Sequence, residues 1–175
     1  QRIANGTSRG NAERFLAEVR QQVYARAKDP RSPYDLETET DSPVPGLLKT
    51  AATLSESLDQ LIQPMRALSE RLMDVLDESA SELDTALRNR IESVSRSLRR
   101  RAEGELEPWR SMLEALTDGT PKEFVDWFAV SRSQSRDIDV SMRRHYVDPM
   151  LPFAKTVAEP SHGIVITSAT LRDGT

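Results

Sequence analysis

The amino-acid sequence predicts a mainly α-helical protein of the α+β class, in which a long helical hairpin or bundle precedes a β-hairpin and one further strand. Apolar residues recur at helical spacing from residue 47 to residue 118, a stretch too long for strands or a loop. After residue 121 the period changes to the two-residue alternation of strands. Because only 5% of the 175 residues are aromatic, the core is expected to consist mainly of aliphatic side chains.

The first predicted helix covers residues 11–27, with Asn11 as a suitable N-terminal cap. Its apolar residues recur at helical spacing and are Phe15, Leu16, Val19 and Val23. Residues 28–45 contain four prolines and no apolar periodicity, so they are predicted to form a linker. We divide the chain into a helical region, residues 1–118, and a C-terminal region, residues 119–175.

A strict apolar stripe with alternating steps of four and three predicts the first helix of the hairpin. Its members are Leu47, Ala51, Leu54, Leu58, Leu61, Met65, Leu68, Leu72 and Val75. Such a stripe is typical of a helix that packs along its partner at a shallow angle. Pro64 lacks a backbone donor and crowds the preceding turn, which predicts one continuous helix with a kink near Leu61.

A second stripe begins after Ser79 or Ser81 and predicts the other helix of the hairpin. Its members are Leu83, Leu87, Ile91, Val94, Leu98, Ala102 and Leu106, then Trp109, Met112, Leu113 and Leu116. Gly104 and Pro108 are expected to interrupt this helix, and Asp118-Gly119 to end it. The helix of residues 11–27 is expected to pack on the hairpin, because neither long helix can bury its stripe alone.

The C-terminal region is predicted to form a β-hairpin, a short helix and a strand. Residues 124–130 are mostly apolar, residues 132–136 form a polar turn, and residues 138–142 alternate as in a half-buried strand. Residues 149–158 suit a short helix. Residues 164–166 are three β-branched apolar residues, as in a strand covered on both faces. The hydroxyl residues after them would lie where loops of α/β sheets meet ligands, or would form a turn without such a role.

The composition excludes several kinds of site. Without cysteine, the chain holds neither a disulfide nor a cysteine-ligated iron–sulfur cluster. The two histidines, His145 and His162, are too few and too isolated to indicate a metal site. No Gly-Lys-Ser/Thr loop is present to hold nucleotide phosphates. Neither a membrane-spanning apolar run nor a signal peptide is visible, so we expect a cytoplasmic protein without a membrane partner.

Because the formal net charge is -4, any contact with nucleic acid must come from a local basic patch. Two groups of arginines are candidates for contact with phosphates. They are Arg96, Arg99, Arg100 and Arg101 on the second long helix, and Arg143 and Arg144 in the β-hairpin. The alternative is a solvated helix face on which the first group pairs with Glu92, Glu103 and Glu105.

The segment Thr167-Ser168-Ala169-Thr170-Leu171 resembles the Ser-Ala-Thr motif of superfamily 2 helicases. With the preceding Gly163-Ile164-Val165-Ile166, it is similar to the form found in DinG-like ATP-dependent DNA helicases, which are relatives of the XPD group. Residues 124–130, Asp148-Pro149 and Pro152-Phe153-Ala154 also resemble the approach to this motif. The resemblance is specific over residues 123–172, and over residues 11–118 it concerns the helical layout.

The resemblance implies that this chain is the helical arch inserted in the first motor domain, ending in a strand that re-enters a RecA-like α/β sheet. Ser168 and Thr170 would couple the nucleotide site to movement on single-stranded DNA through their hydroxyls, while Ala169 provides close packing. ATP and Mg²⁺ would be bound elsewhere in the parent protein, since this segment lacks the phosphate loop and the Asp-Glu-x-His box. The segment itself would bind no cofactor.

The chain from Gln1 to Thr175 is accordingly expected to be a fragment of a bacterial cytoplasmic helicase with repair or replication duties, inactive as an ATPase by itself. The unpaired edge of its last strand would allow self-association. The alternative is a non-enzymatic helical bundle with a structural or partner-binding role, because sustained heptads serve self-association as well as internal packing.

Overall fold

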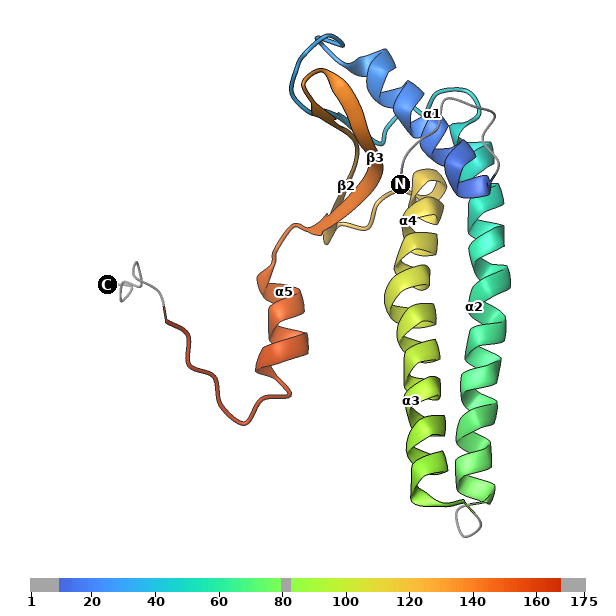
Figure 1. Cartoon of the computed structure of the whole chain (residues 1–175). Helices are drawn as coiled ribbons and strands as arrows, with labels where there is room; N and C mark the ends of the chain where they lie inside the picture. Colours follow the sequence, from blue (N-terminus) through green and yellow to red (C-terminus); the bar gives the residue numbers. More distant parts are fainter. Residues whose placement is uncertain (1–9, 80–82, 168–175) are drawn as a thin grey trace.

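The computed structural model describes residues 10–79 and 83–167. These residues are mainly helical and include one three-stranded antiparallel sheet, in agreement with the predicted α+β class. Two long helical segments lie side by side and extend away from the sheet (Figure 1). The elements in chain order are α1 (Asn11–Arg26), β1 (Leu36–Glu39), α2 (Leu47–Glu78), α3 (Thr85–Arg101), the π-helical turn η1 (Ala102–Leu106), α4 (Glu107–Asp118), β2 (Phe124–Ser133), β3 (Arg136–Tyr146), α5 (Met150–Phe153) and the π-helical turn η2 (Ala154–Ala158).

The predicted β-hairpin is confirmed, and its second strand is β3. The sheet has the order β1-β2-β3, and β2 is antiparallel to both neighbours. The turn is shorter than predicted, because only Gln134 and Ser135 lie between the strands. Both residues have positive φ, 50° and 62°, as a tight two-residue hairpin turn requires. Arg132 and Arg136, expected in the turn, are therefore part of the strands.

A bulge in β3 explains why Ile138 is exposed although its position in the alternation predicted burial. Ser131 pairs with Asp139 and Arg132 with Asp137, so Ile138 is an extra residue without an opposite partner. A bulge of this kind changes the face on which the neighbouring side chains lie. The core does contain the other two predicted apolar residues of this strand, Val140 and Met142.

The predicted linker, residues 28–45, contains a strand that the sequence did not indicate. This strand, β1, pairs with β2 and places Leu36 opposite Val130 at one edge of the sheet. Only Leu36 of its four residues is buried, so it lacks the apolar alternation that would reveal a strand. Prolines flank it on both sides, which suits a short edge strand.

Helix α1 joins the sheet to the helical hairpin. Its residues Phe15, Val19 and Val23 are fully buried, and the helix contacts α2 and all three strands. Gly10, rather than the predicted Asn11, is the N-cap, and the Asn11 side chain instead donates a hydrogen bond to Ser57 Oγ at 2.7 Å. One hydrophobic core therefore contains residues from both sides of the predicted boundary at residue 118.

Helix α2 continues through Pro64 as one helix, as predicted, and packs against the segment made of α3, η1 and α4. Its buried positions follow the predicted stripe up to Leu58 and then advance by one residue; they continue with Ile62, Ser69 and Leu76. Leu61 and Leu68, predicted to face the partner helix, are instead 54% and 50% exposed. A straight helix drifts by about 20° per heptad, so over a long contact the facing position passes to the next residue.

The predicted interruption by Gly104 and Pro108 takes the form of the wide turn η1, and the helix does not break there. Pro108 has no N–H to donate, and its ring crowds the carbonyl group of Gly104, four residues earlier. The π-helical turn, closed by a hydrogen bond from the Glu107 N–H to the Ala102 carbonyl, adds the space that the proline needs. α3 and α4 thus act as one long helix against α2.

The short helix predicted at residues 149–158 is confirmed as α5 and η2, none of whose residues is buried. The strand predicted at residues 164–166 is wrong for this structure, since residues 161–167 form no strand. Ile164, Val165 and Ile166 are 40%, 89% and 62% exposed. A strand covered on both faces needs paired neighbours, and within the described residues this segment meets none.

Candidate functional site

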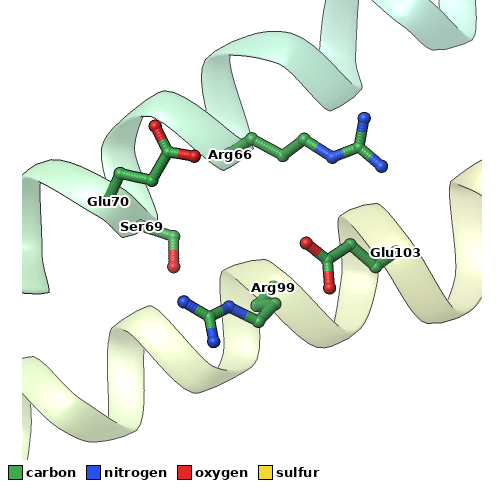
Figure 2. A pocket seen from close by; sticks show the side chains of 5 residues that line it. All are labelled: Arg66, Ser69, Glu70, Arg99 and Glu103. Atoms are coloured by element: carbon green, nitrogen blue, oxygen red, sulfur yellow. The ribbon is translucent and has the colours of Figure 1, made fainter.

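Two charged hollows lie on the helical hairpin beside the wide turn η1. A small hollow of about 120 Å³ opens between the two long helices, and its lining consists of Arg66, Ser69, Glu70, Arg99 and Glu103. Figure 2 shows Arg66 and Glu70 extending from one helix, and Arg99 and Glu103 from the other. A shallower depression of about 400 Å³ shares part of this lining and continues along α3; its lining consists of Arg96, Arg99, Arg100, Glu103 and Gly104.

Two serines hold the helices together beneath the small hollow. Ser69 and Ser95 are buried, with their Oγ atoms 2.8 Å apart, and each Oγ lies 3.2 Å from the backbone oxygen of the other residue. Mutual hydrogen bonding satisfies these buried hydroxyls, so neither is available as a nucleophile. The groups that a ligand could contact at this site are therefore the long charged side chains around the two serines.

Three of the predicted phosphate-binding residues, Arg96, Arg99 and Arg100, are exposed around the depression on α3. Of the pairings expected for a solvated helix face, Arg100 with Glu105 is present at 3.8 Å, and both side chains are more than half exposed. Such an exposed pair contributes little to stability. In the described part of the chain, Arg96 and Arg99 have no ion pair, so their guanidinium groups remain accessible to a phosphate or a carboxylate.

The structure does not bring all six predicted arginines together. Arg101 is exposed on the other face of the hairpin, away from both hollows. Arg143 and Arg144 lie in β3, where Arg143 donates hydrogen bonds to Ser131 and Ser141 and lies 3.7 Å from a Glu37 carboxylate oxygen. The candidate phosphate site is therefore limited to α3, and Arg143 is a separate, partly exposed cation.

Arg144 is held by a buried ion pair. Its Nε and Nη2 atoms lie 2.7 and 2.6 Å from the two carboxylate oxygens of Asp126, and the Asp126 side chain is fully buried. The guanidinium also lies 4.7 Å from the centre of the Phe124 ring and donates a hydrogen bond to Ser111 in α4. Since these contacts use the whole guanidinium group, Arg144 connects the sheet to the hairpin.

A second charged cluster, which the sequence did not indicate, surrounds Asp137 at the end of the β-hairpin. Arg20 Nε lies 2.7 Å from one carboxylate oxygen, and the Tyr24 hydroxyl donates to the other at 2.7 Å. Arg132 Nε lies 3.3 Å away. Although burial alone raises the pKa of Asp137, the hydrogen bonds from Tyr24 and Arg20 and the two positive charges hold this pKa below its usual value.

The same cluster raises the pKa of Tyr24, first through burial and then through its hydrogen bond to the Asp137 carboxylate. The Asp137 hydrogen bond also raises the pKa of Arg20. The single carboxylate of Asp137 pairs with two guanidinium groups, those of Arg20 and Arg132, and the contacts join α1 to β3. We therefore assign it a structural role. The bulge at Ile138 accompanies the inward position of Asp137, and nothing in the local sequence reveals such a bulge.

The predicted coupling residues Ser168, Ala169 and Thr170 lie outside the described residues. Among residues 10–79 and 83–167, no three His, Cys, Asp or Glu side chains are grouped to hold a metal ion. No helix in the same ranges is long and apolar enough to cross a membrane. His145 packs edge-on against Trp127, with ring centres 4.8 Å apart, and has no arrangement typical of a ligand or a catalytic base.

Comparison with protein families, curated proteins and solved structures found no match for this chain. The chemistry of the candidate site therefore follows from its own side chains. Exposed guanidinium groups bind phosphates and carboxylates through charge-assisted hydrogen bonds. The residues lining the two hollows contain no histidine and no pair of nucleophile and base, so they are suited to binding.

Proposed function

We propose that this chain is the arch segment of a DinG-like ATP-dependent DNA helicase of bacterial cytoplasm, with a role in DNA repair or replication. In this proposal the parent protein binds ATP, Mg²⁺ and single-stranded DNA, and the chain leads back into a RecA-like motor domain. Ser168 and Thr170 couple ATP hydrolysis to movement on the strand, and Ala169 allows close packing. The α2–α3 hairpin frames the path of the DNA.

The observation that carries the proposal is the exposed approach to the Ser-Ala-Thr motif. Ile164, Val165 and Ile166 are β-branched and apolar, yet between 40% and 89% exposed. Full burial of such a side chain is worth about 1.5–3 kcal/mol, so the segment favours any partner that covers it. A motor-domain sheet would cover it on both faces, as the sequence of these residues suits.

The accessible arginines of α3 supply the second support. Arg96, Arg99 and Arg100 lie within one turn of each other and have few competing contacts, so they can follow a phosphate backbone without reading bases. Arg143 can add a separate contact. Arg144 is left out of the proposed DNA-binding set because Asp126 already holds it.

Val165→Asp, made both in this chain and in the parent protein, tests whether the motor domain covers the exposed segment at residues 164–166. In this chain Val165 is 89% exposed, so the substitution is expected to change the free energy of unfolding by less than about 0.5 kcal/mol. In the parent protein it would bury an unpaired carboxylate and is expected to abolish DNA-stimulated ATPase activity. An unchanged ATPase would refute the buried position of this segment.

The coupling role is tested by Ser168→Ala combined with Thr170→Ala in the parent protein. Unwinding is expected to fall much more than ATP binding, whereas the exposed-residue control Lys155→Ala should leave both unchanged. This chain alone is expected to show no ATP turnover in the presence of single-stranded DNA, because it has no phosphate loop. Clear turnover by the isolated chain would contradict the proposal.

A second candidate is a non-enzymatic helical module that binds a partner protein, and the exposed leucines of α2 favour it. The coding sequence upstream of Gln1 separates the two candidates. A Gly-Lys-Thr loop followed by an Asp-Glu-x-His box supports the helicase. A reading frame that starts close to Gln1 supports the helical module.

A further inference from the structure

Four large apolar side chains of the two long helices are about half exposed in the described structure. Leu61 and Leu68 of α2 are 54% and 50% exposed, and Leu87 and Val94 of α3 are both 44% exposed. On each helix the two residues are seven positions apart, so they lie almost directly above one another. Each helix therefore carries a second apolar line beside the one that it buries against its partner.

The two exposed lines lie on the same face of the hairpin. Ser69 of α2 faces Ser95 of α3. In two antiparallel helices, the residues that directly precede the two facing residues lie on the same face of the helix pair. Those residues are Leu68 and Val94. The residues just after the serines, Glu70 and Arg96, turn to the other side. The position of the two hollows agrees with this, because Glu70 and Arg96 contribute to their lining.

We define the apolar face as Leu61, Leu68, Leu87 and Val94. Three exposed arginines make its margins basic. Arg71 lies three positions after Leu68, Arg90 lies four positions before Val94, and Arg101 lies seven positions after Val94. None of the three has an ion pair within the described residues. Acidic side chains stand at the two ends, Glu78 near the tip and Glu105, which pairs with Arg100.

We propose that the apolar face binds one amphipathic helix of a partner protein, whose apolar stripe is flanked by acidic residues. A third helix packs at a shallow angle into the groove between two helices when each of them carries apolar residues every seven positions along that groove. The apolar face has this arrangement. The three unpaired arginines would meet the acidic flanks. A second copy of this chain fits less well, because its own arginines would approach them. The proposal does not depend on the helicase assignment.

The test uses the full chain and two synthetic helical peptides of about 20 residues, long enough to form stable helices. Both carry leucine at alternating steps of three and four, and the flanking positions hold glutamate in one and lysine in the other. Fluorescence anisotropy is expected to show binding of the glutamate peptide only. Leu68→Gln with Val94→Gln should weaken this binding by at least about tenfold, as expected for central apolar contacts.

Met73→Gln is the matched control, because Met73 is a 37% exposed apolar residue of α2 outside the apolar face. It should leave the affinity for the glutamate peptide unchanged. Replacement of Arg71, Arg90 and Arg101 by glutamate should make the chain bind the lysine peptide more tightly than the glutamate peptide. A surface that binds any apolar helix non-specifically would not change its preference in this way. Circular dichroism monitors folding of each variant.

Three results would overturn the proposal. The first is equal binding of both peptides, or of neither. The second is a dimer in sedimentation experiments that Leu68→Gln with Val94→Gln dissolves, which would assign the apolar face to a second copy. The third is binding to anionic phosphatidylserine vesicles that the same substitutions remove, which would assign it to a membrane surface.

Discussion

Replacement of Arg144 tests whether this residue stabilises the fold or belongs to a DNA contact. Its guanidinium makes two bonds of 2.6 and 2.7 Å to Asp126, whose side chain is fully buried, while the Arg144 side chain is 12% exposed. Arg144→Ala would leave the Asp126 carboxylate buried without its counter-charge. Removing one partner from a buried pair typically costs about 3–5 kcal/mol, because the desolvation of the other partner is no longer compensated.

The Thr120 hydroxyl, which donates to Asp126 at 3.0 Å, would remain and recover a small part of this loss. We therefore expect Arg144→Ala to lower the free energy of unfolding by about 3 kcal/mol, measured by urea denaturation with circular dichroism. Asp126→Ala should have a similar effect. The double variant should cost clearly less than the sum, since removing both charges leaves no unpaired group.

Arg143→Ala is the matched control, one position away on the same strand. Its 3.7 Å contact with Glu37 is exposed, so its loss should cost less than about 1 kcal/mol. If Arg144→Ala were no more destabilising than Arg143→Ala, or if its effect simply added to that of Asp126→Ala, the assignment of Arg144 to the fold would be refuted.

Three further predictions concern other contacts. Asp137→Asn should lower the free energy of unfolding by about 1.5–3 kcal/mol near neutral pH. Because folding lowers the pKa of Asp137 from 3.8, the stabilisation is complete above pH 3.8 and is lost as the pH falls through the folded-state pKa. The urea midpoints of the original chain and of the variant should therefore converge in acid. Gly46→Ala should cost about 1–2 kcal/mol in thermal unfolding, because φ is 98° and the added Cβ would lie 3.2 Å from a buried carboxylate oxygen of α1, whereas Gly163→Ala should be neutral. Ser69→Ala with Ser95→Ala should cost less than the sum of the single changes, because each single change leaves one buried hydroxyl without its partner; strictly additive losses would contradict this.

The long helices and the β-hairpin were predictable because their signals are local and repeated. The stripe from Leu47 to Leu58 matches the buried positions, and a two-residue alternation marks β3. The exchange of Leu68 for Ser69 at the helix contact was not predictable from apolarity. It depends on the drift of a helix with 3.6 residues per turn away from a strict seven-residue repeat, and a buried serine is acceptable there only because Ser95 lies opposite.

The missed features depend on partners that are distant in sequence. β1 has a single buried residue, Leu36, and exists because β2 offers an edge 94 positions away along the chain. The exposed segment at residues 164–166 shows the reverse case, in which a strand-like sequence finds no neighbour in the described residues. For the candidate site, the sequence predicted a phosphate contact by the arginines of α3, and Arg96, Arg99 and Arg100 are exposed there. It did not separate them from Arg144, because nothing near Arg144 in the sequence reveals its pairing with Asp126.

The serine contact has a consequence for how the hairpin opens. The main hydrophobic core extends along the helices as far as Met65 and Ala102. Beyond it the buried residues of α2 are Ser69, which meets Ser95, and Leu76. Backbone amides near the tip should therefore exchange with solvent deuterium through local fraying. Those near Leu47 and Leu54 should exchange only when the whole molecule unfolds. The hairpin thus combines a rigid base with an end that can adjust its spacing without disturbing the sheet.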